Sequence, residues 1–413
     1  MRFLFCSFSS PGFLFPLIGL AAELERRGHS VAFVSGVQAG DVLGREGLRR
    51  IPRGDRDGPS FNVSTWYIPI SVAIDVKHIE YAIATEHPDV IVTHHLCLSA
   101  LIVRDRHTMP SAVLGPMAYL YPPVRATVPP LSADCARRLQ WRLDEGTRVL
   151  NDARQLFHLR PVTGTAELNA MLGDLFMLRT GPFLEPNLDA LPSRVHAVGP
   201  CTWEPRGGGG AGGDVEAWQY LRAAFADPDA PVVYVHNGRA FDGPSFWPHL
   251  VRGLGSAPIQ VVASVARMDA EVGVLPRNFL ARPHVSQDLV LPHAKAVVAS
   301  GHSTVAIGAA VHGVPSVLIP NGVETPENTD RLVSAGCAVA LDIEALTPAI
   351  IWDALDGLLR DGTIRRNCLG LREKLRAMDT FAPAARLVET MARRREPVAR
   401  DEAVSMADAV HAV

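Results

Sequence analysis

The chain has 413 residues, of which 47% are hydrophobic and 20% are charged, and its formal net charge is −3. This length allows two domains with a core each, and this composition excludes a disordered chain. The near-neutral charge gives no reason to expect nucleic acid or a membrane surface as a partner.

The N-terminal segment has the pattern of a strand, a helix and a second strand. An apolar run over 3–9 predicts the first strand, a helix is expected over about 15–27, and 31–34 predicts the next strand. Such a βαβ unit implies a parallel sheet with crossover helices. The turn "SSPG" at 9–12 interrupts the apolar run, which argues against a secretory signal. No stretch reaches the roughly 18 apolar residues of a membrane span.

The six cysteines are scattered and include no C-x-x-C pair. We therefore expect small buried thiols in a reducing cytoplasm, without a disulfide framework. His, Cys and Asp do not occur together at ligand spacing, so no metal site is expected. A resident cofactor is not expected either.

The strand and helix alternation is interrupted once, by the glycine-rich stretch "PRGGGGAGGD" at 205–214, which is typical of a flexible linker. Apolar runs predict further strands at 89–93, 111–115, 231–236, 259–264, 294–299 and 316–320. The Pro- and Arg-rich stretch 116–190 is expected to form helices and loops.

This division predicts two α/β domains. Ligands bind at the carboxyl ends of the strands in such sheets, so two joined domains are expected to place a cleft between these ends. The expected boundaries are an N-terminal domain over 1–205, a linker over 206–214, a C-terminal domain over 215–380 and a helical tail over 381–413.

The segment "ASGHSTVAIGAAVHGVPSVLIP" at 299–320 predicts a strand end, a glycine turn and a helix start. The first N–H groups of a helix lack intrahelical partners and lie at the positive end of its dipole. This layout favours an anion as the ligand.

Three segments resemble family 1 glycosyltransferases of GT-B fold, of the bacterial antibiotic and macrolide type. The segment 284–341, which begins "HVSQDLVLPHAKAVVASGHSTV", looks like the donor-binding segment of that family. Residues 9–31 are similar to its first loop, helix and second strand, and "VHAVGP" at 195–200 to the strand that leaves its first domain. The resemblance implies two Rossmann-like domains that face each other across a cleft.

The resemblance also implies donor-binding residues by position. The stretch near 285 is expected to contact the nucleotide base. The glycine turn near 301 is expected to contact the diphosphate, and the loop near 324 the sugar. The residues carried over are Val285 and Gln287 for the base; Ser300, Gly301, His302, Ser303, Thr304, Asn237 and Arg239 for the diphosphate; and Glu324 and Thr325 for the sugar.

Two positions in this segment depart from the family pattern. Ser300 replaces the phosphate-contacting His, although a hydroxyl still donates one hydrogen bond. His302 and Arg239 could supply charge-assisted donors instead, or could be a tolerated turn residue and a surface charge. Gly308 replaces the ribose-gripping Glu, which favours a TDP-sugar over a UDP-sugar because deoxyribose has one hydroxyl fewer. A gap filled by water is the alternative.

The largest departure is at Phe13, which stands where the family has its catalytic His. The Asp that orients that His corresponds to His94, which His95 follows. An imidazole suits general-base chemistry at neutral pH. We therefore take His94 or His95 as the candidate base, the alternative being two structural histidines. Phe13, Trp66 and Tyr67 are candidates for the acceptor pocket, although large aromatics are more often core.

These observations predict an inverting glycosyltransferase that moves a deoxysugar from a nucleotide donor, TDP- or UDP-linked, to a small hydrophobic natural product. The donor enters as a substrate and not as a cofactor. Three alternatives stay open: an acceptor that needs no strong base, a catalytically impaired auxiliary or ligand-binding protein, and a GT-B sugar-nucleotide epimerase. A homodimer is a further hypothesis.

Overall fold

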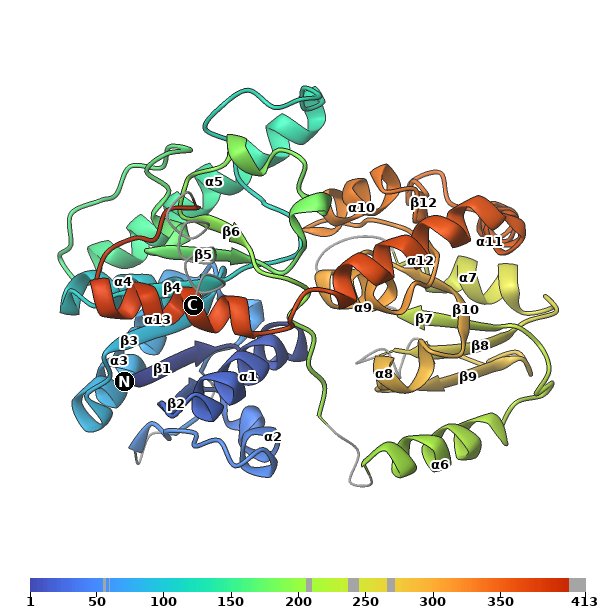
Figure 1. Cartoon of the computed structure of the whole chain (residues 1–413), viewed down its shortest axis with the longest axis horizontal. Coiled ribbons are helices and arrows are strands. Elements are labelled where there is room, and N and C mark those ends of the chain that lie inside the picture. The colour runs from blue at the N-terminus through green and yellow to red at the C-terminus, as the bar shows by residue number, and fades with distance from the viewer. Residues whose placement is uncertain (55–56, 59, 206–209, 237–244, 266–271, 401–413) are drawn as a thin grey trace, which may run out of the picture. The chain divides into compact units, whose positions relative to one another are not determined.

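The computed structural model describes residues 1–54, 57–58, 60–205, 210–236, 245–265 and 272–400 (Figure 1). The chain divides into two compact units. The first comprises the described residues of Met1–Trp203 and Asp379–Val413, and the second comprises those of Glu204–Met378. Asn237 and Arg239, two candidate diphosphate ligands, lie outside the described residues.

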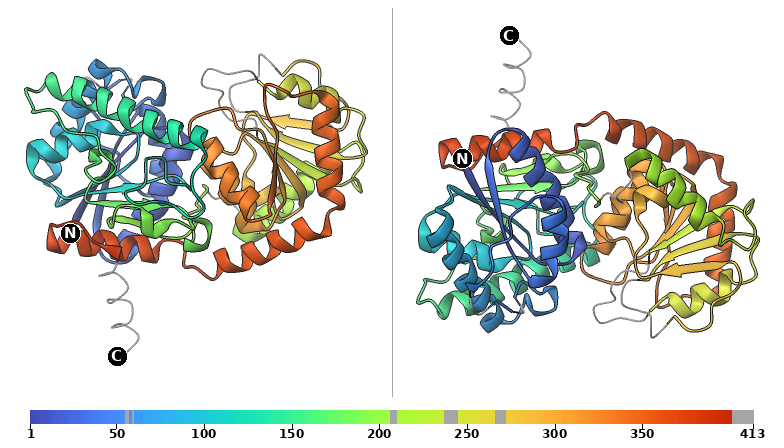
Figure 2. Two further views of the ribbon diagram at one scale, coloured as in Figure 1. Left: turned by 90° about the horizontal axis from the view of Figure 1, so that it is seen from above. Right: turned by 90° about the horizontal axis from the view of Figure 1, so that it is seen from below.

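The first unit is built on a parallel six-stranded sheet with the order β2-β1-β3-β4-β5-β6. Its strands are β1 (Arg2–Ser7), β2 (Ser30–Ser35), β3 (Val90–His94), β4 (Ser111–Leu114), β5 (Leu175–Leu178) and β6 (Val195–Ala197). Its α-helices are α1 (Pro11–Arg26), α2 (Gly40–Arg45), α3 (Pro69–Glu86), α4 (Leu98–His107), α5 (Ala133–Gln155) and α13 (Ala382–Arg394). Helices lie on both faces of this sheet (Figure 2).

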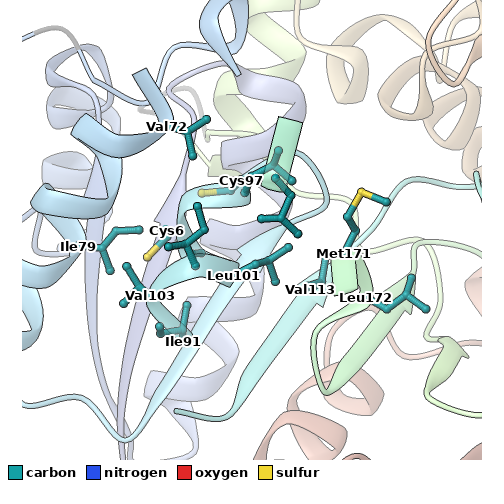
Figure 3. Packing of buried hydrophobic residues seen from close by; sticks show 14 of the residues in the cluster. Cys6, Val72, Ile79, Ile91, Cys97, Leu101, Val103, Val113, Met171 and Leu172 are labelled. Carbon is teal, nitrogen blue, oxygen red and sulfur yellow. The ribbon is translucent and has the colours of Figure 1, made fainter. Parts of the chain in front are cut away.

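Alternation along the strands separates two cores in the first unit, because successive side chains point to opposite faces. Leu4 and Cys6 of β1 belong to one cluster, and Phe3 and Phe5 belong to the other. Figure 3 shows part of the first cluster, in which strand residues pack against α3 and α4. Its labelled members are Cys6, Val72, Ile79, Ile91, Cys97, Leu101, Val103, Val113, Met171 and Leu172.

The second unit repeats the design with the strand order β12-β11-β10-β7-β8-β9, again parallel throughout. Its strands are β7 (Val232–His236), β8 (Gln260–Ser264), β9 (Phe279–Arg282), β10 (Ala294–Ala299), β11 (Ser316–Leu318) and β12 (Ala338–Ala340). Its helices are α6 (Gly210–Arg222), α7 (Trp247–Leu254), α8 (Gln287–Val290), α9 (Ser303–His312), α10 (Thr325–Ser334), α11 (Pro348–Arg360) and α12 (Gly362–Arg376).

The tail helix α13 is part of the first unit. The Arg27 guanidinium donates to both carboxylate oxygens of Glu389 at 2.7 and 2.8 Å, and Nε2 of His29 lies 2.8 Å from the same carboxylate. These partners, Arg27 foremost, lower the pKa of Glu389 to about 2. Gly19 of α1 also approaches the Phe381 ring so closely that a Cβ would lie 2.1 Å from it.

Three sequence expectations need correction. Helix α1 begins at Pro11 and not near residue 15, because proline is well suited to the first turn of a helix. Helix α6 begins at Gly210, inside the expected linker. The stretch 116–190, expected without strands, contains β5, whose four residues are fully buried between its neighbours. Among the helices of the described ranges, none is long and apolar enough to cross a membrane.

Candidate functional site

The glycine turn between β10 and α9 forms as the sequence predicts. Gly301 has φ +89°, a conformation that glycine adopts without strain. A Cβ at this position would lie 2.8 Å from Oγ1 of Thr329 and 3.3 Å from the carbonyl oxygen of Thr325. The turn therefore packs directly against α10 and leads into the ten-residue helix α9.

Three buried polar atoms at this turn have no hydrogen-bond partner among the described residues: Oγ of Ser300, Nε2 of His302 and Oγ1 of Thr329. The Ser300 and Thr329 side chains are at most 2% exposed. Burial of an unpaired hydroxyl costs about 1–3 kcal/mol, so native proteins rarely accept it without reason. A ligand with several acceptor oxygens, such as a diphosphate, would pair with all three groups.

Glu324 and Asn328 clamp the same turn from the start of α10. Oε1 of Glu324 accepts the backbone N–H of Ser303 at 2.8 Å. The Asn328 amide donates to the Gly301 carbonyl at 3.0 Å and to the Ser303 hydroxyl at 3.1 Å. A carboxylate at a helix N-terminus is stabilised by the helix dipole. The carboxylate of Glu324 therefore lies at the start of α9, where the helix dipole attracts an anion. The contact of Glu324 with a donor sugar stays a prediction.

The hydroxyl of Thr325, the other candidate sugar ligand, is already used inside the loop. It donates to the carbonyl oxygen of Gly322 at 2.7 Å and accepts the N–H of Asn321 at 3.1 Å. The side chain is fully buried. The structure thus assigns Thr325 a contact that closes the turn.

The expected base-binding stretch leads into the short helix α8. Val285 is buried, and the Ser286 side chain caps α8 through the N–H of Leu289. Oε2 of Glu204 accepts the Ser286 hydroxyl at 2.6 Å and the Gln287 N–H at 2.8 Å. Burial is the main reason that the pKa of Glu204 is raised.

Two residues of this region were missed by sequence reasoning. Glu204 is an isolated acid beside the glycine-rich stretch, and only the fold brings it to α8. Thr329 follows Asn328 directly, but nothing in the sequence indicates that its hydroxyl lies against the glycine turn. The other members of the turn, Ser303 and Thr304, are the first two residues of α9, as expected.

In the first unit, Phe13 and His94 lie side by side as the resemblance implies. Phe13 is in the first turns of α1, and His94 is the last residue of β3. Their ring centroids are 4.5 Å apart, and the Phe8 ring lies 4.4 Å from His94 and 5.5 Å from Phe13, so the three rings pack together in one cluster. Trp66 instead packs against the core, and Tyr67 is half exposed. Neither lines the space next to Phe13.

The surroundings of His94 disfavour the charged form of its ring. Nε2 accepts the backbone N–H of Phe8 at 3.1 Å, and Nδ1 lies 3.3 Å from the backbone nitrogen of Leu96. An imidazolium would direct its own N–H groups at these donors. Burial, followed by the nearby His95 and Arg179, holds the pKa of His94 well below its usual value. This geometry argues against His94 as a general base.

His95 is the better placed of the two histidines. It lines a small cavity at the carboxyl end of the sheet, and its ring lies 5.7 Å from that of Phe13. Arg179 reaches the same cavity and is held by its Nε, which donates to the Gly115 carbonyl at 3.0 Å. The cavity is lined by Gly12, Phe13, Pro16, His94, His95, Leu114, Gly115 and Arg179.

Metal ligands are not gathered at either location. In the described ranges, no group of three or more His, Cys, Asp and Glu side chains is placed to hold a metal ion. The groups that the two sites offer are hydroxyls, the imidazoles of His94, His95 and His302, the guanidinium of Arg179, the carboxylate of Glu324 and the dipole of α9.

Comparison with known proteins agrees with this geometry. The family model described as "Erythromycin biosynthesis protein CIII-like, C-terminal domain" matches residues 250–391. Demethyllactenocin mycarosyltransferase of Streptomyces fradiae is 24% identical over 410 residues, which cover 92% of this chain and 84% of that protein. The desosaminyl transferase of Saccharopolyspora erythraea that acts on 3-alpha-mycarosylerythronolide B is 28% identical over 150 residues, 36% of each chain.

Solved structures show the same fold. The glycotransferase of kitacinnamycin aligns with a TM-score of 0.72 at 22% identity and covers 94% of this chain and 98% of its own. The glycosyltransferase VinC, solved in complex with DTDP, aligns with a TM-score of 0.65 at 19% identity over 95% of this chain and 100% of its own.

Two parallel α/β sheets and a polar glycine turn at the start of α9 thus define a GT-B glycosyltransferase. More particularly, residues 250–391 match a family model from macrolide biosynthesis, and most of the chain is similar to a macrolide glycosyltransferase. The chain is a glycosyltransferase. The fold class and the family resemblance predicted from the sequence are confirmed.

Proposed function

We propose that the chain transfers a deoxysugar from a TDP-linked donor to a hydroxyl group of a small hydrophobic natural product, with inversion at the anomeric carbon. The observation that carries this proposal is the start of α9, where the buried hydroxyls of Ser300 and Thr329 lack partners among the described residues. Such groups suit the oxygens of a diphosphate.

The preference for thymidine rests on two further observations. Related glycosyltransferases of this fold have been solved with DTDP and with thymidine diphosphate. In this chain, α9 carries Gly308 where a carboxylate would bind ribose hydroxyls. A donor with fewer pentose hydroxyls loses fewer hydrogen bonds when glycine replaces that carboxylate.

The reaction is a single displacement. The acceptor oxygen forms a bond to the anomeric carbon while the bond from that carbon to the diphosphate breaks on the opposite face. The proton of the acceptor hydroxyl passes to His95, and the diphosphate leaves with the bonding electron pair. The dipole of α9 and the donors at its start stabilise the charge on the leaving group.

Glu324 has a second role in this scheme. The diphosphate competes with its carboxylate for the N–H of Ser303, to which it lies at 2.8 Å. Once displaced, the carboxylate accepts hydrogen bonds from hydroxyls of the donor sugar. Asn237 and Arg239 complete the diphosphate contacts in the proposal.

The partners in the proposal are the nucleotide sugar and the hydrophobic acceptor. A reducing compartment, the cytoplasm, suits the six free buried thiols. A homodimer is a separate hypothesis, which sedimentation of the purified chain would test.

The test is release of nucleoside diphosphate from a panel of TDP- and UDP-sugars, with and without macrolide acceptors. We expect TDP release that requires an acceptor. Gly301→Ala should abolish it, because the substitution is strained at φ +89° and meets Thr329. Gly370→Ala is the matched control, since a Cβ there meets nothing within 4 Å.

Three outcomes contradict the proposal. Turnover of the donor without an acceptor would indicate an epimerase. Nucleotide binding without turnover of any donor would indicate an auxiliary protein. A preference for UDP-sugars would reject the thymidine assignment.

A further inference from the structure

The side chain of Gln287 occupies the space that a side chain at position 308 would need. A Cβ built on Gly308 would lie 2.1 Å from Oε1 of Gln287 and 3.2 Å from Cδ1 of Leu291. Gly308 is in α9, whereas Gln287 begins α8, and the two helices are in contact. Because residue 308 has no side chain, the amide of Gln287 can pack directly against α9.

The backbone of Gln287 is held in place, but the oxygen of its side-chain amide has no hydrogen-bond partner among the described residues. Gln287 is 6% exposed, and its backbone N–H is fixed by Glu204 at 2.8 Å. Its Oε1 is buried without a hydrogen-bond partner among the described residues. A buried amide oxygen without a donor is costly, so this oxygen points to a ligand that carries an N–H or O–H group.

The position of Oε1 of Gln287 along α9 indicates which part of a bound nucleotide it would contact. Gly308 is five residues beyond Ser303, which corresponds to about 7.5 Å along the axis of α9. A nucleoside diphosphate whose phosphates lie at the start of α9 has its pentose at that distance. The pentose carries hydroxyl donors, whereas the phosphates carry only acceptors.

We infer that the Gln287–Gly308 pair sets the pentose specificity of the donor site, which rests on the proposed function above. Oε1 of Gln287 accepts one pentose hydroxyl. The neighbouring Leu291 is apolar and 1% exposed, so it offers no partner to a second one. A 2′-hydroxyl would lose its water there without a replacement, and the site therefore prefers 2′-deoxyribonucleoside diphosphates whatever the base.

Calorimetry with matched nucleotides tests this inference. The diphosphates dUDP and UDP differ only in the 2′-hydroxyl, and TDP and dUDP differ only in the base methyl group. We expect the unaltered chain to bind dUDP about tenfold more tightly than UDP, the effect of roughly one hydrogen bond. Inorganic pyrophosphate reports the phosphate contacts alone.

Two variants remove the amide in different ways. Gly308→Ala displaces the flexible end of Gln287 without touching the backbone, and Gln287→Met keeps the length of the chain but removes the acceptor. Each should weaken dUDP binding about tenfold and leave pyrophosphate binding unchanged. Gly370→Ala, also a glycine within a helix, should change neither.

The outcomes separate the two proposals. Equal affinities of the unaltered chain for dUDP and UDP, or unchanged dUDP affinity in both variants, would overturn the pentose assignment and leave the transferase intact. An unaltered chain that binds neither the nucleotides nor pyrophosphate would overturn the donor site itself.

Discussion

The carboxyl ends of β3 and β10 are equivalent places in two sheets of the same design, but they are filled differently. At the end of β3, the rings of Phe8 and Phe13 pack against the buried His94, and the backbone N–H of Phe8 donates to its Nε2. At the end of β10, buried hydroxyls such as that of Ser300 lack partners among the described residues. At the first end aromatic rings surround much of the polar group, whereas at the second end polar groups stay unpaired among the described residues.

This difference shows that equivalent ends of two sheets can hold different chemical groups within one chain. In the first unit, Phe13 and His94 stand where the resemblance implies a base and its orienting acid, and their rings pack against each other. The pKa of His94 is lowered because burial penalises its charged form. In the second unit, the polar groups surround a helix start, whose N–H groups do not depend on side-chain identity.

The largest expected effect is at His95. If it takes the acceptor proton, His95→Gln should lower kcat about 10²- to 10⁴-fold, the usual contribution of a general base. The acidic limb of the pH profile of kcat should disappear with it. His107→Gln, at an exposed histidine, is the control. An unchanged kcat would return the first unit to a purely structural role.

The buried His94 predicts a pH dependence of stability. Its folded-state pKa lies below the unfolded value of 6.5. The stabilisation is therefore complete above about pH 6.5 and is lost as the pH falls towards the folded value. The slope is at most about 1.4 kcal/mol per pH unit for one proton. Thermal melts from pH 7.5 to 5 should show this slope, and His94→Asn should flatten it. An equal slope in both proteins would mean that His94 has the same pKa in the folded and unfolded chains.

At the glycine turn before α9, loss of a single hydroxyl should weaken the binding of the donor moderately. Ser300→Ala and Thr329→Val each remove one donor, for an expected five- to tenfold loss of TDP affinity, or about 1 kcal/mol. Thr363→Val, at an exposed residue of α12, is the matched control. Calorimetry with TDP measures both effects. Unchanged affinity in both variants would place the diphosphate away from this turn.

The smallest effect is expected at Glu324. Glu324→Gln removes the charge that competes for the start of α9, and TDP should bind about two- to fivefold more tightly, as helix-dipole energies suggest. The affinity for the intact TDP-sugar should rise less, because the carboxylate also accepts hydrogen bonds from the sugar hydroxyls. Weaker TDP binding by the variant would show that Glu324 supports the diphosphate site and does not compete with it.

Local patterns predicted most of the fold. Apolar runs located β1, β2, β3 and β4 in the first unit and β7, β8, β10 and β11 in the second. They missed β5, β9 and β12, which are short strands, and the helical start of 210–214. A run of three or four residues carries little periodicity, so such short strands were located in some places, as at β4 and β11, and missed in others.

The sequence by itself determined the two α/β units, the glycine turn at 301 and the adjacency of Phe13 and His94, because motif order and strand order bring carboxyl ends together. Only the tertiary structure decided which histidine is enclosed, that Glu324 reaches Ser303, and that Gln287 lies against Gly308. These are contacts between elements that are distant along the chain. Burial and hydrogen bonding there depend on packing in three dimensions, which spacing along the sequence does not encode.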